Sequence, residues 1–100
     1  MGGRKMKIIQ ANFYVKNDKR EDFLADIVPL IASTRLEEGC LLYDLYESVE
    51  KKNQFVMIEH WKNQESIDKH NQNPLLINLF GKMSEYAEKK TELIITEKEE

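Results

Sequence analysis

The sequence has one cysteine, two prolines and four glycines among its 100 residues, and it has no long hydrophobic run. A lone cysteine, Cys40, cannot form an internal disulfide and fits a reducing compartment, so we expect a cytoplasmic location. No apolar stretch approaches the roughly 18 residues that a membrane-spanning helix needs. The few glycines form neither a phosphate-binding loop nor a Gly-x-Ser-x-Gly nucleophile turn, so both kinds of site are excluded.

The charged residues also exclude several functions. The 15 Lys and Arg residues are scattered, and the net charge is −3, so we expect neither nucleic acid nor a membrane surface as a partner. The spacings typical of metal sites, such as His-x-Glu, His-Glu-x-x-His or a Cys/His cluster, do not occur. We therefore expect no metal and no cofactor.

What the sequence does contain is typical of one globular domain. Hydrophobic residues make up 41% and charged residues 33%. We predict a single domain over residues 6–97, with flexible ends at residues 1–5 and 98–100. Hydrophobic periodicity predicts an α+β protein with the order β-α-β-β-α-α-β. Its four strands are expected at residues 6–15, 40–48, 55–61 and 91–97.

Several residues predict where helices begin and end. Asp18 is expected to cap the first helix, Pro29 to bend it and Gly39 to end it. Asn63 should cap a short second helix from about Gln64. Pro74 should start the third helix in its first turn, where a missing N–H costs nothing.

The strands are apolar on both faces, although three helices can cover only one face of a four-stranded sheet. An exposed apolar sheet is rare in a soluble monomer, and a second copy of the same sheet is the simplest cover. We therefore predict a homodimer. We place Ile9, Ala11, Phe13, Val56 and Ile58 at its interface.

The end of the third strand and the helix after it carry the candidate site. Trp61 follows Glu59 on one strand face, and His70 lies nine residues further on. His70 could move a proton near neutral pH, or it could be a helix histidine bonded to a backbone carbonyl. Glu59 could be a buried base or reach solvent, and Trp61 could be core. Asn12 either pairs with backbone or points into the pocket.

We predict that Asn12, Trp61 and His70 converge on one cavity on the helical side of the sheet. Glu59 and the apolar helix faces should line it, so the expected pocket residues are Glu59, Phe23, Ile27, Ile67 and Phe80.

Three segments in order resemble the antibiotic biosynthesis monooxygenase domain family. They are Glu37-Glu38-Gly39-Cys40, then Phe55 to Trp61 ending in Glu-x-Trp, then His70 with Asn73-Pro74. The resemblance covers about residues 6–97. It implies a ferredoxin-like subunit that pairs sheet to sheet into a dimeric α+β barrel.

The resemblance also implies chemistry. Characterised relatives oxidise quinols and phenols with O2 and without metal or flavin, so the substrate here would be a small aromatic or quinol-like compound and O2. By position, Asn12 and Trp61 would be hydrogen-bond donors and His70 the acid/base. Many relatives have a second His where this chain has Leu75. Haem degradation is disfavoured, because the helix that holds the haem-ligating His in that branch has none here.

Two other functions stay open at this point. The chain could isomerise or break down a small carbonyl metabolite or signal, with His70 moving protons. It could also be a non-catalytic dimeric protein that binds small apolar ligands. A dry pocket without polar partners for His70 would favour the binding protein, and a basic subsite of the size of a phosphate would favour the isomerase.

Overall fold

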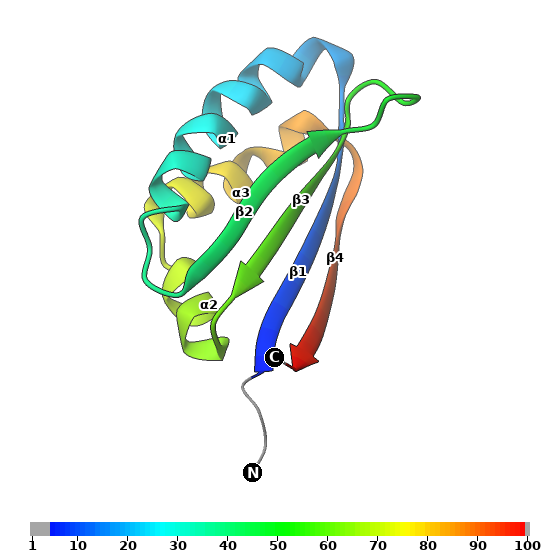
Figure 1. The fold of residues 1–100 in the computed structure, drawn as a ribbon. Coiled ribbons are helices and arrows are strands. Elements are labelled where there is room, and N and C mark those ends of the chain that lie inside the picture. Colours follow the sequence, from blue (N-terminus) through cyan, green and yellow to red (C-terminus); the bar gives the residue numbers. More distant parts are fainter. Residues whose placement is uncertain (1–4, 100) are drawn as a thin grey trace.

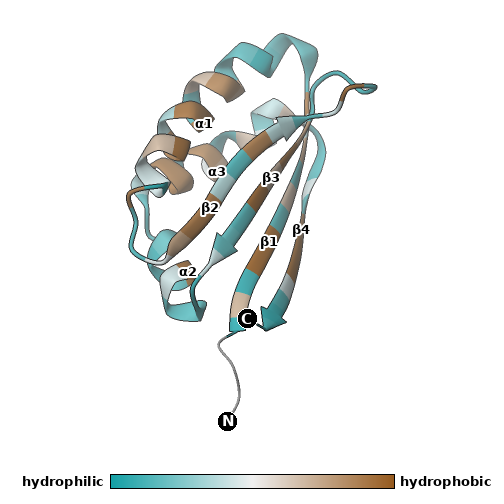
Figure 2. Cartoon of the chain, in the orientation of Figure 1, coloured by the Kyte–Doolittle hydropathy of each residue, from teal (hydrophilic) through white to brown (hydrophobic). Residues whose placement is uncertain are grey.

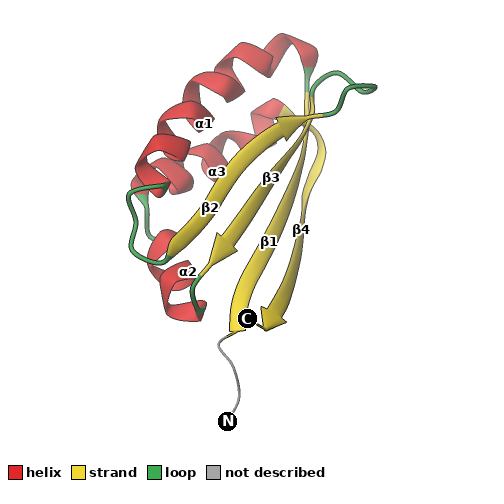
Figure 3. Cartoon of the chain, viewed as in Figure 1, coloured by secondary structure: helices red, strands yellow, loops and turns green. Residues whose placement is uncertain are grey.

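The structure is a computed structural model that describes residues 5–99. One antiparallel sheet of four strands, in the order β2-β3-β1-β4, carries all its helices on one side (Figure 1 and Figure 3). This is the ferredoxin-like α+β fold that was predicted. The elements in chain order are β1 (Lys5–Val15), the 3₁₀ helix η1 (Asn17–Lys19), α1 (Arg20–Thr34), β2 (Cys40–Glu47), β3 (Gln54–Trp61), α2 (Gln64–His70), α3 (Pro74–Tyr86) and β4 (Ala87–Glu99).

The predicted helix starts are confirmed for α2 and α3 but not for α1. Asn63 accepts a hydrogen bond from the Ser66 amide at the start of α2, and Asn73 caps α3 with Pro74 in its first turn. The predicted Asp18 cap is wrong. The chain makes η1 first, and α1 then begins at Arg20 without a side-chain cap.

The loop between α1 and β2 depends on Gly39. The helix already ends at Thr34, so Gly39 does not end it as predicted. Gly39 has φ +87, and a Cβ built there would lie 1.9 Å from Ser66 Oγ. Glycine is therefore required here both for its backbone conformation and for the close approach of the loop to α2.

The two ends of the sheet extend beyond the predicted limits. Lys5 pairs with Glu99 and Met6 pairs with Lys98, so β1 and β4 stay hydrogen-bonded over segments that were expected to be flexible. Residues 1–4 and Glu100 lie outside the described residues. Within residues 5–99, no helix is both long and apolar enough to cross a membrane.

The core lies between the sheet and the helices, and it includes the face of β1 that was predicted to meet a partner. Ile9, Ala11 and Phe13 are at most 7% exposed. Ala11 pairs with Met57 and Phe13 with Phe55, and such partners share one face. The prediction for this face is wrong because α1 and α3 pack their own apolar residues against the most apolar side of the sheet and bury it.

The other face of the sheet is not covered by a helix (Figure 1). Val56 and Ile58 lie on it, as predicted, and their partners on β1 are Asn12 and Gln10. Figure 2 shows that apolar residues recur along the strands as well as on α1 and α3. We call this uncovered side the open face, and it includes Leu42, Tyr46, Val56, Ile58 and Ile94.

Candidate functional site

Asn12 does not belong to the predicted cavity. It lies on the open face opposite Val56, whereas Trp61 lies on the helical face of β3, fully buried. The Oδ1 atom of Asn12 accepts a hydrogen bond from Gln10 Nε2 at 3.3 Å. The predicted convergence of three residues is therefore wrong for Asn12. It assigned Asn12 to the helical side, although side chains alternate along β1 and Asn12 falls between the buried Ala11 and Phe13.

Glu59 is buried beside Trp61, two residues further along β3 on the same face. Glu59 is only 6% exposed, and its Oε1 accepts a hydrogen bond from Trp61 Nε1 at 3.0 Å. Burial raises the pKa of Glu59 to about 7, although the Trp61 hydrogen bond opposes this shift. Of the two interpretations left open, the buried carboxylate is the correct one. Trp61 uses its N–H on Glu59.

His70, the last residue of α2, is held by a carboxylate. Its Nδ1 lies 3.1 Å from Glu37 Oε1, and Glu37 Oε2 accepts a hydrogen bond from Asn73 Nδ2 at 2.7 Å. The Asn73 side-chain amide also donates to Ser33 Oγ at 3.1 Å, which ties Glu37 to α1 and α3. Burial lowers the pKa of His70, and the Glu37 carboxylate opposes this effect. A buried, neutral imidazole that donates from Nδ1 to Glu37 keeps Nε2 as a proton acceptor.

Aromatic rings fix the orientation of His70. Its ring centroid lies 4.6 Å from that of Trp61 and 5.4 Å from that of Tyr43. Tyr43 is 3% exposed, and its burial raises the pKa of the phenol, with Glu59 adding to the shift. These contacts leave His70 little freedom to rotate, which a positioned proton acceptor requires.

Glu59 and His70 line one small cavity between the sheet and the helices, which we call the inner cavity. Its volume is about 70 Å³. The predicted pocket residues Ile27 and Phe80 also line it, whereas Phe23 and Ile67 are buried in the core without lining it. Trp61 does not line it either, so of the three residues predicted to converge on one cavity only His70 does so. The other lining residues are Ile9, Ala11, Phe13, Leu30, Tyr43, Asn71, Leu76, Leu79 and Leu93.

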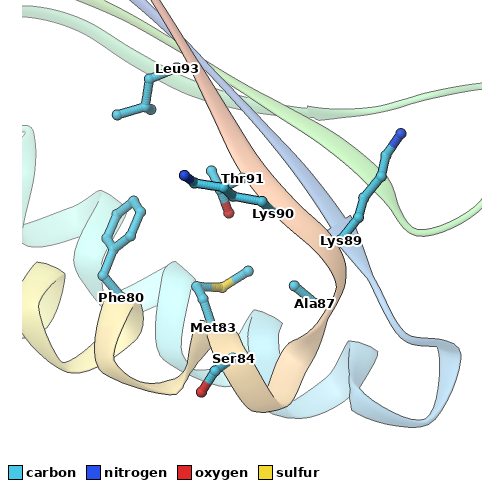
Figure 4. Close-up of a pocket in the computed structure, with 8 residues that line it drawn as sticks. All are labelled: Phe80, Met83, Ser84, Ala87, Lys89, Lys90, Thr91 and Leu93. Atoms are coloured by element: carbon cyan, nitrogen blue, oxygen red, sulfur yellow. The ribbon is translucent and has the colours of Figure 1, made fainter.

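A larger hollow, which we call the outer pocket, lies between the last turns of α3 and the start of β4 (Figure 4). Its volume is about 520 Å³, within the ~300–1,000 Å³ typical of ligand sites. Phe80 and Leu93 line both the outer pocket and the inner cavity. The two spaces are therefore neighbours, with Phe80 and Leu93 as their shared wall.

Two residues of the site escaped prediction. Glu37 precedes β2 in a loop, and only a contact across 33 residues brings it to His70. Tyr43 lies on a strand that is apolar on both faces, so alternation could not assign its side. Within residues 5–99, no three His, Cys, Asp or Glu side chains gather as a metal site. The arrangement offers two buried proton acceptors next to an apolar pocket.

Comparison with known proteins shows the family of the chain. Residues 6–78 match the family described as antibiotic biosynthesis monooxygenase. The chain is 36% identical over 92 residues to the Bacillus subtilis (strain 168) protein named "Putative monooxygenase YcnE", which covers 92% of this chain and 97% of that protein.

Solved structures share both the fold and part of the sequence. A conserved protein from Methanosarcina mazei Go1 has a TM-score of 0.84 and 31% identity, over 93% of this chain and 91% of that one. Rv0793 from Mycobacterium tuberculosis has a TM-score of 0.85 and 26% identity, over 91% and 92%. The chain therefore belongs to the antibiotic biosynthesis monooxygenase family.

Proposed function

We propose that the protein is a monooxygenase that oxidises a small quinol or phenol-like compound with O2 and needs no metal or flavin. One observation carries the proposal: Glu59 and His70, both buried, line one cavity that adjoins an apolar pocket. A hydroxyl group of the substrate must lose its proton before its ring can react with O2. Burial raises the pKa of Glu59 to about 7, so this carboxylate takes a proton more readily than an ordinary one near neutral pH.

The proton acceptor in this mechanism is the pair of Glu59 and His70. Glu37 holds His70 through Nδ1, so Nε2 is left to accept the proton. Trp61 orients Glu59 through its indole N–H. Asn12 has no part in this mechanism, because it lies on the open face.

The substrate supplies all the electrons for the reaction. In 1,4-dihydroxynaphthalene, one hydroxyl group is deprotonated, and the resulting anion transfers electrons to O2 as a C–O bond forms at the adjacent ring carbon. The hydroperoxide then loses water, which breaks the O–O bond and leaves a carbonyl oxygen on the ring. One atom of O2 enters 2-hydroxy-1,4-naphthoquinone and the other enters water, and the four electrons that reduce O2 come from the substrate.

The sizes of the two spaces suggest where the reactants bind. The inner cavity is far smaller than a typical ligand site, whereas the outer pocket has room for fused rings. The ring would lie in the outer pocket with its hydroxyl group directed past Phe80 and Leu93. Phe80 is 41% exposed, so its side chain has space to move.

We also infer a homodimer through the open face, with the interface corrected to the side that carries Val56 and Ile58. Tyr46 is 54% and Ile94 is 50% exposed on this side. An obligate interface of this kind should bury more than ~2,000 Å² in total. The sheet would then be covered on both faces.

The two alternative functions make different demands on the site. A binding protein has no need for a carboxylate that orients a buried imidazole, which Glu37 provides here. An isomerase would leave O2 unused.

The test of the proposed function is incubation of the protein and 1,4-dihydroxynaphthalene under ¹⁸O2, followed by mass spectrometry. We expect one ¹⁸O atom in the hydroxyquinone. A product without label, or hydrogen peroxide formed together with unsubstituted quinone, would contradict the proposal.

A further inference from the structure

We propose that the outer pocket selects an aromatic substrate that carries a carboxylate, and that Lys90 binds this group. The inference rests on the function proposed above and names the substrate class of the same site. It goes beyond the two proton acceptors, because it concerns a second polar group of the substrate.

The floor of the outer pocket suits an aromatic ring. Phe80 and Met83 on α3 face Leu93 on β4, and Ala87 lies at the junction of the two elements (Figure 4). Aromatic and thioether side chains pack well against a flat apolar ring. With a volume of about 520 Å³, the pocket has space for a bicyclic ring and one substituent.

A β-bulge brings Lys90 to this pocket. Asn12 pairs with Glu92 and Tyr14 with Lys89, so two residues of β4, Lys90 and Thr91, stand opposite the single residue between Asn12 and Tyr14. A bulge redirects side chains that strict alternation would send elsewhere. Both bulge residues line the outer pocket, and the amino group of Lys90 points toward its Phe80 side (Figure 4).

The charges around the outer pocket favour an anion. Its lining contains two lysines and, among the residues that the structure describes, no Asp or Glu. Lys89 points to the other side of β4, where its Nζ lies 4.1 Å from the centre of the Tyr14 ring. Lys90 makes no ion pair with any carboxylate of residues 5–99. The outer pocket therefore combines an apolar floor with positive charge at its edge, although the chain as a whole has a net charge of −3.

The position of Lys90 also restricts where the carboxylate of the substrate lies. Phe80 and Leu93 form the wall toward Glu59 and His70, and the amino group of Lys90 points to the Phe80 side of the pocket. A carboxylate bound to Lys90 therefore lies on the side of the ring that faces the inner cavity, the same side as the reacting hydroxyl group. Substrates without the carboxylate would bind more weakly and in more than one orientation.

Binding can be measured without any oxidation, by titrating the protein with 2-naphthoate and with its neutral analogue 2-naphthamide. We expect the wild type to bind 2-naphthoate more tightly. Lys90→Met, which keeps an unbranched side chain without the charge, should weaken naphthoate binding by about 3- to 5-fold, as for a partly exposed charge pair. It should leave naphthamide binding unchanged. Lys51→Met, in the exposed turn between β2 and β3 and outside the pocket lining, is the matched control and should affect neither ligand.

Methionine methyl groups report where the ligand binds. Met83 lines the outer pocket, whereas Met57 is 1% exposed in the core. In ¹³C-methyl NMR spectra, 2-naphthoate should shift the Met83 signal and leave the Met57 signal in place. Equal affinity for the two ligands, equal losses in the two lysine variants, or an unmoved Met83 signal on binding would each overturn the proposal.

The outcome is separable from that of the proposed function. If naphthoate binds through Lys90 but quinols consume no O2, the site for an aromatic carboxylate stands and the oxygenase proposal fails. If 1,4-dihydroxynaphthalene is oxygenated equally well by the wild type and by Lys90→Met, and 2-naphthoate binds no better than 2-naphthamide, the oxygenase stands and the selection by Lys90 fails.

Discussion

The indole N–H of Trp61 donates a hydrogen bond of 3.0 Å to the buried carboxylate of Glu59, which lies two residues earlier on the same face of β3. This bond stabilises the charged form of Glu59, whereas burial disfavours it, and the pKa settles at about 7. Trp61 therefore adjusts the proton affinity of Glu59. This differs from the role that the family resemblance implied, which was to donate a hydrogen bond to the substrate.

The first prediction concerns this adjustment. If charged Glu59 is the active form, the rate of oxygen uptake should rise with pH through about 7. Trp61→Phe removes a contact that lowers the pKa, so the midpoint should move to higher pH. The loss of rate at pH 9 should be small, because Glu59 is charged at this pH in the variant as well as in the wild type. A midpoint that stays in place or falls would contradict this role of Trp61.

The burial of Glu59 should also affect stability. Its pKa is raised from 4.5 to about 7 in the folded protein, so the folded state binds more protons than the unfolded state between these values. Stability is therefore lost as pH rises through this range. Glu59→Gln removes this dependence and should stabilise the protein at pH 8 by up to about 3 kcal/mol relative to its effect at pH 4.

Urea unfolding at pH 4 and pH 8 measures this difference. Glu38→Gln, which removes an exposed carboxylate, is the control and should show no such pH dependence. Equal effects of Glu59→Gln at the two pH values would show that the Glu59 carboxyl group is hydrated.

Glu37 is expected to act as a positioning residue through His70. Glu37→Gln keeps a hydrogen-bond acceptor but removes the charge that raises the pKa of His70, so this pKa should fall further. We expect a loss of about 10-fold in kcat with little change in KM, because a neutral partner orients the imidazole less firmly. Histidine ¹⁵N chemical shifts should also show a change in the tautomer balance. An unchanged kcat together with unchanged shifts would remove Glu37 from the mechanism.

The homodimer can be tested on the open face. Ile58→Lys places a charge at the centre of this face, opposite Asp44 on β2, so the subunit itself should tolerate it. We expect sedimentation of a dimer for the wild type and of a monomer for Ile58→Lys at micromolar concentration. Val28→Lys on α1, at a residue that is 57% exposed, should stay dimeric. A monomeric wild-type protein would contradict the inferred interface.

Alternation and capping residues were enough to predict the order of the elements, the pairing of Trp61 with Glu59 on one face, and the position of His70 beside them. They were not enough to choose which side of β1 faces the helices, because both sides carry apolar residues and only the packing of α1 and α3 decides. That ambiguity misplaced Asn12. Glu37 and Tyr43 could not be predicted as site residues, since each depends on contacts between segments far apart in the sequence.

The most direct test of the account is oxygen uptake with 1,4-dihydroxynaphthalene, in the presence of a metal chelator and corrected for uncatalysed oxidation. The wild type should consume O2 at a rate that the chelator does not change. His70→Ala should lower this rate by ~10²–10⁴-fold, the usual cost of losing a general base, while His60→Gln on the open face should not. Equal rates for wild type and His70→Ala, or a rate abolished by the chelator, would contradict the account.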